Sequence, residues 1–494
     1  MRNLSKSKII AFRQCPKRLW LEVHKNHLRD DSASEAVFQI GYQVGNIAQT
    51  LYDPEGMGET IDIVALGHGE ALARSAKLLL QGLSPVFEAG LSMDGALAYA
   101  DVMLPERSSG GLQWKMIEVK SSTSVKPYHL DDIAVQTHIA INSGVSLASV
   151  SLAHIDSSFV YPGGGDYQGL LKEVDLTEPS FSRDDEVREW IAAAHAVAEL
   201  AEEPVVPTGI QCSTPFTCGF CGYCNRDRPP VPYPLSSLPY LSKTKRTSLE
   251  EDGYDDLRDV PDDQLNATQM RVKKCSTTGV PYFDAKGAAA DLSSFKFPAT
   301  FLDFETVNFV IPIWKGTRPY QQVPFQFSLH RVGRNGRIEH AEFLDLSGDD
   351  PSLLFARSLV EQCGTKGPVF VYSAAFECSR IRELAQRFPD LEPALLAIND
   401  RVVDLLPIAR DRYYHPSQQG SWSIKAVLPA LCPELSYSQL DGVQDGTAAV
   451  EAFKKAIAVE TTPAERETIR LQLLEYCKLD TYALVRMWQI FRGC

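Results

Sequence analysis

The sequence lacks any apolar run long enough to cross a lipid bilayer. Its longest apolar stretches, such as residues 191–200, fall well short of the roughly 20 residues that a membrane-spanning helix needs. It also lacks the apolar core and small-residue cleavage site of a secretory signal near its first residues. We therefore expect a cytoplasmic protein with no membrane partner.

An excess of basic residues is also missing, because 49 Lys and Arg stand against 63 Asp and Glu, a formal net charge of −14. Affinity for nucleic acid comes mainly from cations placed against phosphates, so this balance excludes a bulk polyanion binder. One basic arm, from Arg2 to Arg29, departs from the average with eight basic residues and one acidic residue. Within it, Arg13, Lys17 and Arg18 are candidate nucleic-acid contacts, and a merely solvated surface is the alternative.

Internal repeats and low-complexity tracts are absent, and 44% hydrophobic residues is ordinary globular composition. A length of 494 residues suggests two or three domains. The proline-rich residues 226–234 would interrupt a helix or a central strand, and so they mark a boundary. We expect an N-terminal domain over residues 1–224, a connector over 225–297 and a C-terminal domain over 298–494.

The N-terminal domain has the residue patterns of a mixed helix and sheet structure. Apolar spacing predicts two helices before the sheet, over residues 4–23 and 38–52. Asp94-Gly95 is a strong hairpin signal between two predicted strands. The expected strands are residues 85–92, 96–104, 112–121 and 145–155, with a helix over residues 130–142 before the last one.

The C-terminal domain begins with a predicted three-stranded meander. Its strands are residues 300–308, 323–332 and 337–346, and Asn335-Gly336 turns the second into the third. A further strand at 368–373 gives the order β-β-β-α-β-α of an RNase H-like sheet, so the expected fold class is α/β (α+β). In the connector, residues 238–264 look like a degenerate helix-hairpin-helix, and we expect a spacer there.

A first set of charged residues lies on the predicted hairpin and the strand after it. Glu118 and Lys120 are two residues apart on one strand and therefore share a face, and Asp101 lies on the strand before. Carboxylate oxygens suit Mg²⁺, and a nearby lysine could orient or activate a water nucleophile for phosphodiester hydrolysis. The alternative is a solvated ion pair on an exposed sheet face.

These residues resemble the RecB-type branch of the PD-(D/E)XK nucleases, in Glu88, Asp101, Glu118-Val119-Lys120 and Gln136 in the expected order. The resemblance implies a metal-dependent nuclease in which Asp101, Glu118 and Glu88 serve the metal. It further implies that Lys120 is the catalytic lysine and Gln136 the helix glutamine. Gly45 stands where a helix histidine is often found, and no tyrosine follows Gln136 four residues on.

Four cysteines crowd into the pattern Cys212-x5-Cys218-x2-Cys221-x2-Cys224. Soft thiolates at such spacing bind zinc or an iron-sulfur cluster, and four local cysteines could hold a tetrahedral Zn²⁺ alone. With Cys15 in Gln14-Cys15-Pro16, the arrangement resembles the iron-sulfur nucleases of the RecB type, including the CRISPR adaptation exonucleases and AddB. The resemblance implies a [4Fe-4S] cluster held by Cys15, Cys212, Cys218 and Cys224, with Cys221 spare or alternative.

A second set of acids begins on the first strand of the C-terminal domain. Asp303 and Glu305 share one face of it, opposite an apolar face, although a half-exposed edge strand would give the same pattern. Glu377 follows a later apolar strand, and Tyr476 and Asp480 share a helix face at i, i+4 spacing. Such a set could hold two divalent ions for phosphoryl displacement.

These five residues resemble the DEDD superfamily of 3′-5′ exonucleases in its tyrosine subtype. Asp303 and Glu305 match the first motif, and Tyr476 and Asp480 match the last. Glu377 stands where Asp is usual in the second motif. The resemblance implies that the four acids bind metal and that Tyr476 positions the attacking water; Asp404 and Lys425 are further candidates near the site.

With Cys15-Pro-Lys-Arg18 near the N-terminus, the distal cysteine triad and the strand Leu302-Asp-Phe-Glu-Thr306, the chain as a whole resembles a bacterial family catalogued as of unknown function. Our hypothesis is a nuclease dependent on Mg²⁺ or Mn²⁺ with two sites, acting on DNA in preference to RNA, at single strands or free ends. A helicase or a defence component is an expected partner, in repair or anti-phage defence. The alternatives are a non-catalytic nucleic-acid or partner-binding protein with decayed sites at Gly45 and Glu377, or an RNA exonuclease with a zinc-stapled accessory domain.

Overall fold

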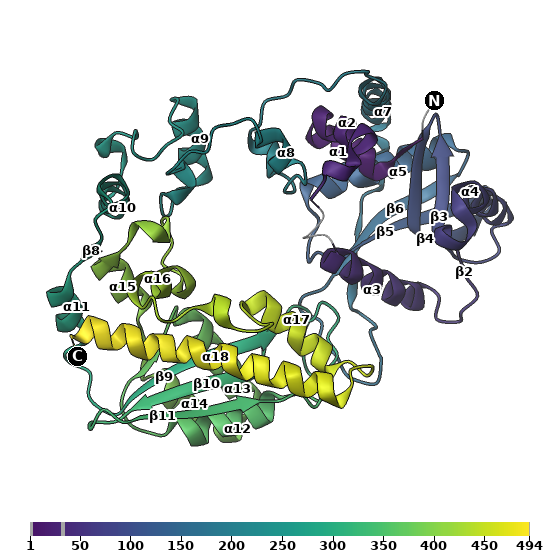
Figure 1. The fold of residues 1–494 in the computed structure, drawn as a ribbon. Coiled ribbons are helices and arrows are strands. Elements are labelled where there is room, and N and C mark those ends of the chain that lie inside the picture. The colour runs from purple at the N-terminus through teal and green to yellow at the C-terminus, as the bar shows by residue number, and fades with distance from the viewer. Residues whose placement is uncertain (1–2, 31–34, 494) are drawn as a thin grey trace. The chain divides into compact units, whose positions relative to one another are not determined.

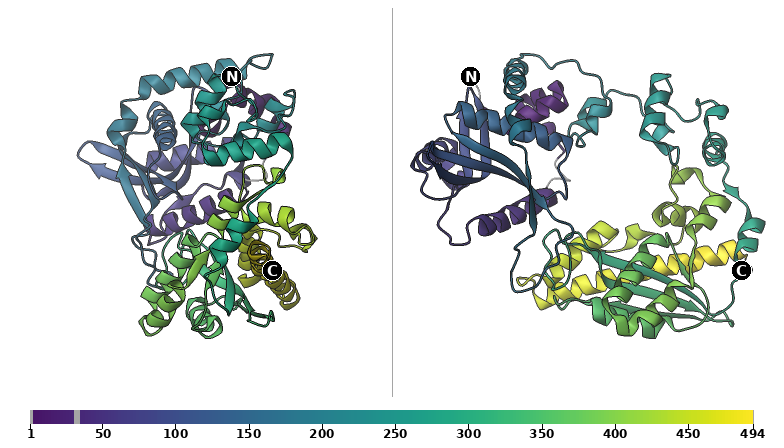
Figure 2. Two further views of the ribbon diagram at one scale, coloured as in Figure 1. Left: turned by 90° about the vertical axis from the view of Figure 1, so that its left-hand side faces the viewer. Right: turned by 180° about the vertical axis from the view of Figure 1, so that it is seen from behind.

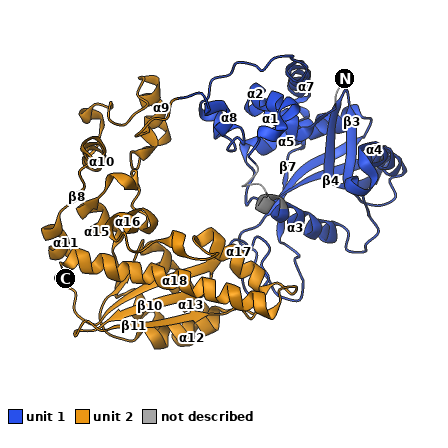
Figure 3. Ribbon diagram, viewed as in Figure 1, with its two compact units in different colours: residues 1–228, 309–320 blue, residues 229–308, 321–494 orange. Residues whose placement is uncertain are grey.

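The computed structural model describes residues 3–30 and 35–493 and divides into two compact units (Figures 1 and 3). Unit 1 comprises Met1–Arg228 and Phe309–Tyr320, and unit 2 comprises Pro229–Asn308 and Gln321–Cys494. Each unit mixes helices with its own main sheet, as the two further views in Figure 2 also show. Among the described residues, no helix combines the length and the apolar character that crossing a membrane requires.

Unit 1 is built on a seven-stranded sheet of order β2-β3-β4-β5-β6-β7, with β1 paired to β4. The turn between β3 and β4 is formed by Asp94 and Gly95, whose φ values of 49° and 77° fit a tight hairpin. The predicted hairpin and the strands that follow it are thus confirmed. The strands are β1 (Leu4–Ser5), β2 (Glu59–Thr60), β3 (Val86–Met93), β4 (Ala96–Ser108), β5 (Gly111–Lys120), β6 (Leu147–Ile155) and β7 (Leu171–Asp175).

The helices of unit 1 differ from the prediction at the N-terminus. The single helix predicted over residues 4–23 is wrong, because the chain is extended at Cys15 (φ −164°, ψ 121°). A residue before proline is disfavoured in the helical region, and Pro16 starts the second helix. The longer helices are α1 (Lys6–Gln14), α2 (Pro16–His24), α3 (Glu35–Tyr52), α4 (Ile63–Gln81), α5 (Pro127–Asn142) and α7 (Asp184–Ala198), and two short ones are α6 (Thr177–Phe181) and α8 (Cys221–Asn225).

Unit 2 contains a five-stranded sheet of order β11-β10-β9-β12-β13. β9, β10 and β11 form the predicted antiparallel meander, and β12 runs parallel to β9 and β13. β9 is therefore a central strand, so the alternative of an edge strand for Asp303 and Glu305 is wrong. The strands are β9 (Ala299–Val307), β10 (Val323–Val332), β11 (Ile338–Leu344), β12 (Val369–Val371) and β13 (Val402–Asp404), and β8 (Tyr282–Phe283) pairs with β14 (Tyr413–Tyr414).

The 30-residue helix α18 (Pro463–Arg492) lies across the strands of this sheet (Figure 1). Gln326 Nε2 on β10 donates to the Leu473 carbonyl, at 2.7 Å, and His330 Nδ1 lies 2.8 Å from Thr481 Oγ1. These bonds fix the helix against β10. The other helices of unit 2 are α9 (Lys243–Glu251), α10 (Ala267–Thr278), α11 (Ala285–Leu292), α12 (Ser352–Cys363), α13 (Ala375–Arg387), α14 (Glu392–Asn399), α15 (Leu406–Arg412), α16 (Ile424–Leu431) and α17 (Gly446–Ile457).

The connector is part of the core of unit 2. Leu249, Leu257 and Val272 are fully buried and belong to the same apolar cluster as Phe301 of β9 and Trp488 of α18. The expectation of a spacer over residues 238–264 is therefore wrong. Apolar side chains in a polar-looking segment hold it against the sheet domain.

Candidate active sites and a cysteine centre

A cavity of about 180 Å³ in unit 2 is lined by the acidic residues that the sequence singled out. β9 contributes Asp303 and Glu305, which leave the same face of the strand. The first turn of α13 contributes Glu377, and α18 contributes Tyr476 and Asp480 one helical turn apart. Three segments far apart in the chain thus bring the four predicted carboxylates and the predicted tyrosine to one cavity.

The carboxylates of this cavity are crowded and poorly hydrated. Burial, followed by the charges of Asp480 and Glu305, raises the pKa of Asp303 well above its ordinary value. Burial also raises the pKa of Glu305 and of Glu377 to about 8, and that of Asp480 to about 6. Like charges held out of water disfavour ionisation, and a divalent cation would relieve both effects.

Other polar groups show which oxygens are free to take a ligand. Glu377 Oε2 is buried and has no hydrogen-bond partner among the described residues. Asp480 Oδ1 accepts a hydrogen bond from the Tyr437 hydroxyl, and the Lys425 ammonium lies 5.3 Å from the centre of the Tyr476 ring. An orphaned carboxylate oxygen in an oxygen-rich cavity fits a hard divalent cation such as Mg²⁺.

Sequence reasoning missed Cys477 and Tyr437. The Cys477 sulfur lies within 4.8 Å of a carboxylate oxygen of Asp303 and of Glu305. Its position directly after Tyr476 is the only sequence signal for it, and nothing in the spacing of Tyr437 points to Asp480. Asp404 does not line the cavity but lies near it, because its charge, after burial, helps to raise the pKa of Glu377. Its carboxylate accepts backbone N–H groups at the start of two helices, those of Ser373, Ala374 and Leu406.

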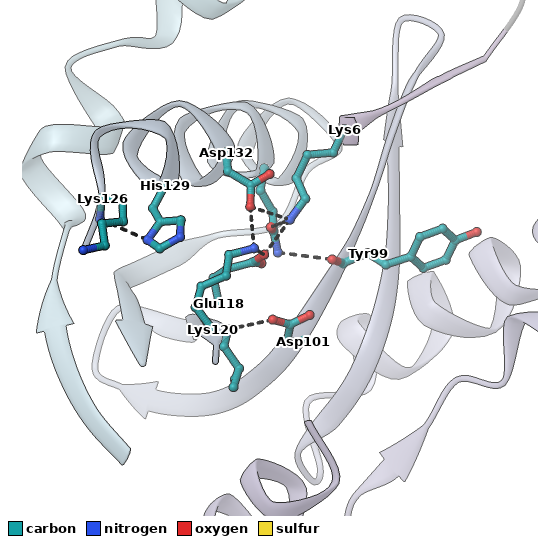
Figure 4. A network of polar contacts seen from close by, with 10 residues as sticks. Lys6, Tyr99, Asp101, Glu118, Lys120, Lys126, His129 and Asp132 are labelled. Carbon is teal, nitrogen blue, oxygen red and sulfur yellow. Dashed lines mark hydrogen bonds and ion pairs between the residues drawn. The ribbon is translucent and has the colours of Figure 1, made fainter. Parts of the chain in front are cut away.

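A second polar cluster lies on the sheet of unit 1 (Figure 4). Glu118 and Lys120 of β5 form an ion pair at 2.6 Å, and Asp101 of β4 accepts a hydrogen bond from the Val119 N–H at 2.6 Å. Lys120 also pairs with Asp132 of α5 at 2.7 Å. Only 3% of Glu118 is exposed, so the alternative of a solvated pair on an open sheet face is wrong.

Gln136, Glu88 and Lys6 complete this cluster. Gln136 is fully buried on α5, and its amide oxygen accepts a hydrogen bond from the Lys6 ammonium at 2.8 Å. Lys6 also donates to Glu118 Oε1 at 2.7 Å. Glu88 lies in β3 with a left-handed φ of 54°. The pairing of β3 with β4 skips Glu88 and Asp101, which therefore lie opposite each other. Sequence reasoning placed Lys6 only in the basic arm from Arg2 to Arg29 and did not connect it with Glu118, which lies 112 residues later.

The charges of the cluster are unevenly satisfied. Burial, followed by the Glu118 charge, raises the pKa of Asp101 well above its ordinary value, and it also raises the pKa of Glu88. Burial alone would raise the pKa of Asp132 too, but the ammonium groups of Lys6 and Lys120 lower it. Glu118 Oε2 has no hydrogen-bond partner among the described residues. This buried free oxygen beside Asp101 fits a divalent cation.

The cysteines meet where α1 ends and α2 begins. Cys15, Cys212, Cys218, Cys221 and Cys224 line one small void, and the Gln14 side chain donates to the carbonyls of residues 211 and 216 at 2.7 Å each. Burial raises the pKa of the Cys218 and Cys224 thiols. The Cys221 thiol donates to the Cys212 carbonyl at 3.4 Å.

The predicted nucleic-acid contacts have partners within unit 1. Lys17 pairs with Glu203 at 2.7 Å and Arg18 with Glu22 at 2.9 Å. The Arg13 guanidinium lies 3.9 Å from the centre of the Trp190 ring. Lys17 and Arg18 thus line the cysteine void and Arg13 packs on α7, and contact of all three with nucleic acid stays a prediction. Arg2 lies outside the described residues.

Comparison with known proteins gave one family. Residues 300–423 match a family described as a domain of unknown function (DUF2779). The matched segment contains Asp303, Glu305 and Glu377 and ends before Tyr476 and Asp480. No curated protein matches the chain. The chain is therefore similar to this family over the segment that carries these three acids of the cavity.

Proposed function

We propose that the protein is a nuclease dependent on Mg²⁺ or Mn²⁺ that hydrolyses phosphodiester bonds of DNA at single strands or free ends. The observation that carries the proposal is the unit 2 cavity, which is lined by four carboxylates from three segments, three of them buried and that of Asp303 half-buried. Such a cluster is unfavourable without a cation. The meander followed by parallel strands supports an RNase H-like fold of the DEDD exonuclease type for this unit.

In unit 2, Asp303, Glu305, Glu377 and Asp480 would hold the metal. Two divalent ions in such a site stabilise the attacking and leaving oxygens of an in-line displacement. Tyr476 lies beside these acids, where its hydroxyl can orient the attacking water.

In unit 1, we propose a second site of the RecB-type PD-(D/E)XK kind. Asp101 and Glu118, with Glu88 beside them, would hold the metal, which would supply a polarised water. Lys120 would orient that water through its ammonium group, and Gln136 would hold Lys6 beside Glu118. The buried, unpartnered Glu118 Oε2 supports a metal at this position.

For the cysteines, we propose a [4Fe-4S] cluster on Cys15, Cys212, Cys218 and Cys224. These four cysteines come from segments about 200 residues apart and line one void, which supports a shared metal centre there. Cys221 lines the same void and stays a spare or alternative ligand.

The proposal is tested on end-labelled DNA and RNA with Mg²⁺. We expect Asp303→Ala and Asp101→Ala each to lower cleavage by at least about 100-fold at its own site, and the double variant to abolish it. Asp400→Ala, an exposed acid of unit 2, should cleave like the parent. Equal background cleavage in every variant would instead favour a binding protein, and cleavage of RNA alone would favour the RNA exonuclease.

A further inference from the structure

We propose that Lys6 is a phosphate-binding residue of the unit 1 site, so that two lysines rather than one face the nucleic acid strand there. The inference rests on the proposed nuclease function and deepens it. It identifies which residue of unit 1 recognises a phosphate oxygen. The substrate class is any single strand with a phosphodiester backbone.

The fold holds Lys6 at a defined place. Leu4 and Ser5 pair in parallel with Ala96 and Leu97 of β4, and the Leu4 N–H donates to the Gly95 carbonyl at 2.7 Å. Leu4 is fully buried, and α1 begins at the next residue but one, Lys6. Lys6 is thus anchored by an added strand and the core below it, and it does not belong to a loose basic arm.

Two ammonium groups converge on the same carboxylate oxygens (Figure 4). Lys6 Nζ lies 2.7 Å from Glu118 Oε1, and Lys120 Nζ lies 2.6 Å from that same oxygen. Both also contact Asp132 Oδ2, at 3.4 and 2.7 Å. Without a metal ion, the carboxylates of Glu118 and Asp132 balance both ammonium groups. A divalent cation held by Asp101 and Glu118 would take up their negative charge and leave the two lysines undercompensated, which favours an anion such as a phosphate beside them.

Gln136 explains how Lys6 can change partner without moving. An ammonium group has three donors, and one of them is directed to the neutral, fully buried Gln136 amide. This bond does not depend on the ionisation of Glu118. If Glu118 Oε1 binds a divalent cation, it no longer accepts the hydrogen bond from Lys6. That N–H of Lys6 would then be available to a phosphate oxygen, in a charge-assisted hydrogen bond of the same kind.

The alternative is a purely structural ion pair that joins α1 to the sheet. The two roles differ in the salt dependence of binding, because each phosphate contact to a single strand contributes about 0.7 to the slope of log K against log salt. A structural ion pair would change stability without changing this slope. The slope is therefore the deciding quantity.

The experiment measures binding of a labelled single-stranded oligonucleotide at several salt concentrations, with Ca²⁺ to limit cleavage. It uses the full chain carrying Asp303→Ala, so that hydrolysis at the unit 2 site is absent. We expect Lys6→Met to lower the slope by about 0.7 and to weaken binding roughly tenfold. Lys8→Met, on the same helix, should match the parent, and Lys6→Arg should restore the slope.

An unchanged slope in folded Lys6→Met would overturn the proposal, and so would an equal fall in Lys8→Met. If Lys6→Met does not fold, Lys6→Gln replaces it with the same expected loss, since it keeps a donor for Gln136. A chain with Asp303→Ala that neither binds nor cleaves the oligonucleotide in any divalent ion would overturn the nuclease function of unit 1 as well. If the chain cleaves the oligonucleotide but Lys6→Met leaves the salt slope of binding unchanged, only the Lys6 proposal is overturned.

Discussion

Asp303 sits on the central strand of its sheet with three other carboxylates around one cavity, and this placement governs its chemistry. Its neighbours on the strand, Leu302 and Phe304, are buried in an apolar cluster on the other face. The alternation of a strand therefore forces the acids toward the cavity, where burial raises the pKa of each of them. The same feature makes the metal-free site a source of instability.

At the residue scale, we predict that metal-free protein loses stability as the pH rises from about 4.5 to about 8. The pKa of Glu305 and of Glu377 is raised from 4.5 to about 8 in the folded chain, so the folded state binds more protons than the unfolded state in this window. Their contribution to the free energy of unfolding is fully present below pH 4.5 and is lost as the pH rises to about 8.

Chemical denaturation across this pH range, in the presence of a chelator, checks the prediction. Glu305→Gln and Glu377→Gln should each flatten the pH profile, whereas Glu392→Gln, at an exposed position of α14, should not. Mg²⁺ should also flatten the profile because it favours the ionised carboxylates. If stability depended on pH in the same way in all variants, the pKa values of Glu305 and Glu377 would not be raised by folding.

We further predict that Asp303→Asn separates stability from activity. Asp303→Asn removes the free-energy cost that the raised pKa of this carboxyl imposes on the folded state at neutral pH, so it should raise the thermal midpoint of the metal-free chain by a few degrees. The same change should lower cleavage at this site by about 100-fold or more. Calorimetry and the cleavage assay on one preparation test both; a lower midpoint would mean that Asp303 serves the fold instead.

At the element scale, the break between α1 and α2 is what brings Cys15 to the other cysteines. The extended Cys15 ends one helix and precedes Pro16 of the next, and Gln14 fastens this corner to the segment before Cys218. If α1 and α2 were one continuous helix, the geometry of that helix alone would fix the direction of the Cys15 side chain. The corner therefore joins chain segments about 200 residues apart.

We predict that Cys15→Ser and Cys218→Ser lose the brown colour and the absorption near about 400 nm of an iron-sulfur protein purified without oxygen. Both should also lower the unfolding temperature, since metal binding contributes to folding. Cys221→Ser is the matched control and should keep colour and stability. A colourless parent protein containing one zinc would contradict the cluster and favour a zinc staple.

At the scale of the whole molecule, unit 1 includes a segment that follows β9 in the chain. Within unit 1, Val310 packs against Val44 and Ile155, and the Tyr320 hydroxyl donates to the Ser121 carbonyl directly after Lys120. The Tyr161 N–H also donates to the carbonyl of residue 317 at 3.0 Å. Residues 1–228 alone therefore lack part of their own core.

We predict that a fragment of residues 1–228 is less stable than the same unit in the full chain. Adding residues 309–320 through a flexible linker should recover most of the lost stability, because it restores the buried contacts of Val310 and Tyr320. A scrambled version of the added segment is the control. Equal unfolding temperatures with and without the segment would contradict its structural role.

Much of the fold was predictable because short-range rules set it. Asp94-Gly95 fixed the hairpin, and period-two patterns located the strands that bear Glu118 and Asp303. The end of α1 at Cys15 follows from a further rule, that a residue before proline is disfavoured in the helical conformation. Lys6 and Tyr437 could not be predicted, because each reaches an acid more than 40 residues away through tertiary packing, which leaves no spacing to read.

The central claim is that the carboxylates of the unit 2 cavity bind divalent metal. Crystals of the protein soaked in Mn²⁺, measured at an energy where manganese scatters anomalously, test it most directly. We predict anomalous peaks among Asp303, Glu305, Glu377 and Asp480, about 3.5–4 Å apart if two ions bind, and their loss in Asp303→Asn. An empty cavity at saturating Mn²⁺, with all four carboxylates ordered, would contradict the account.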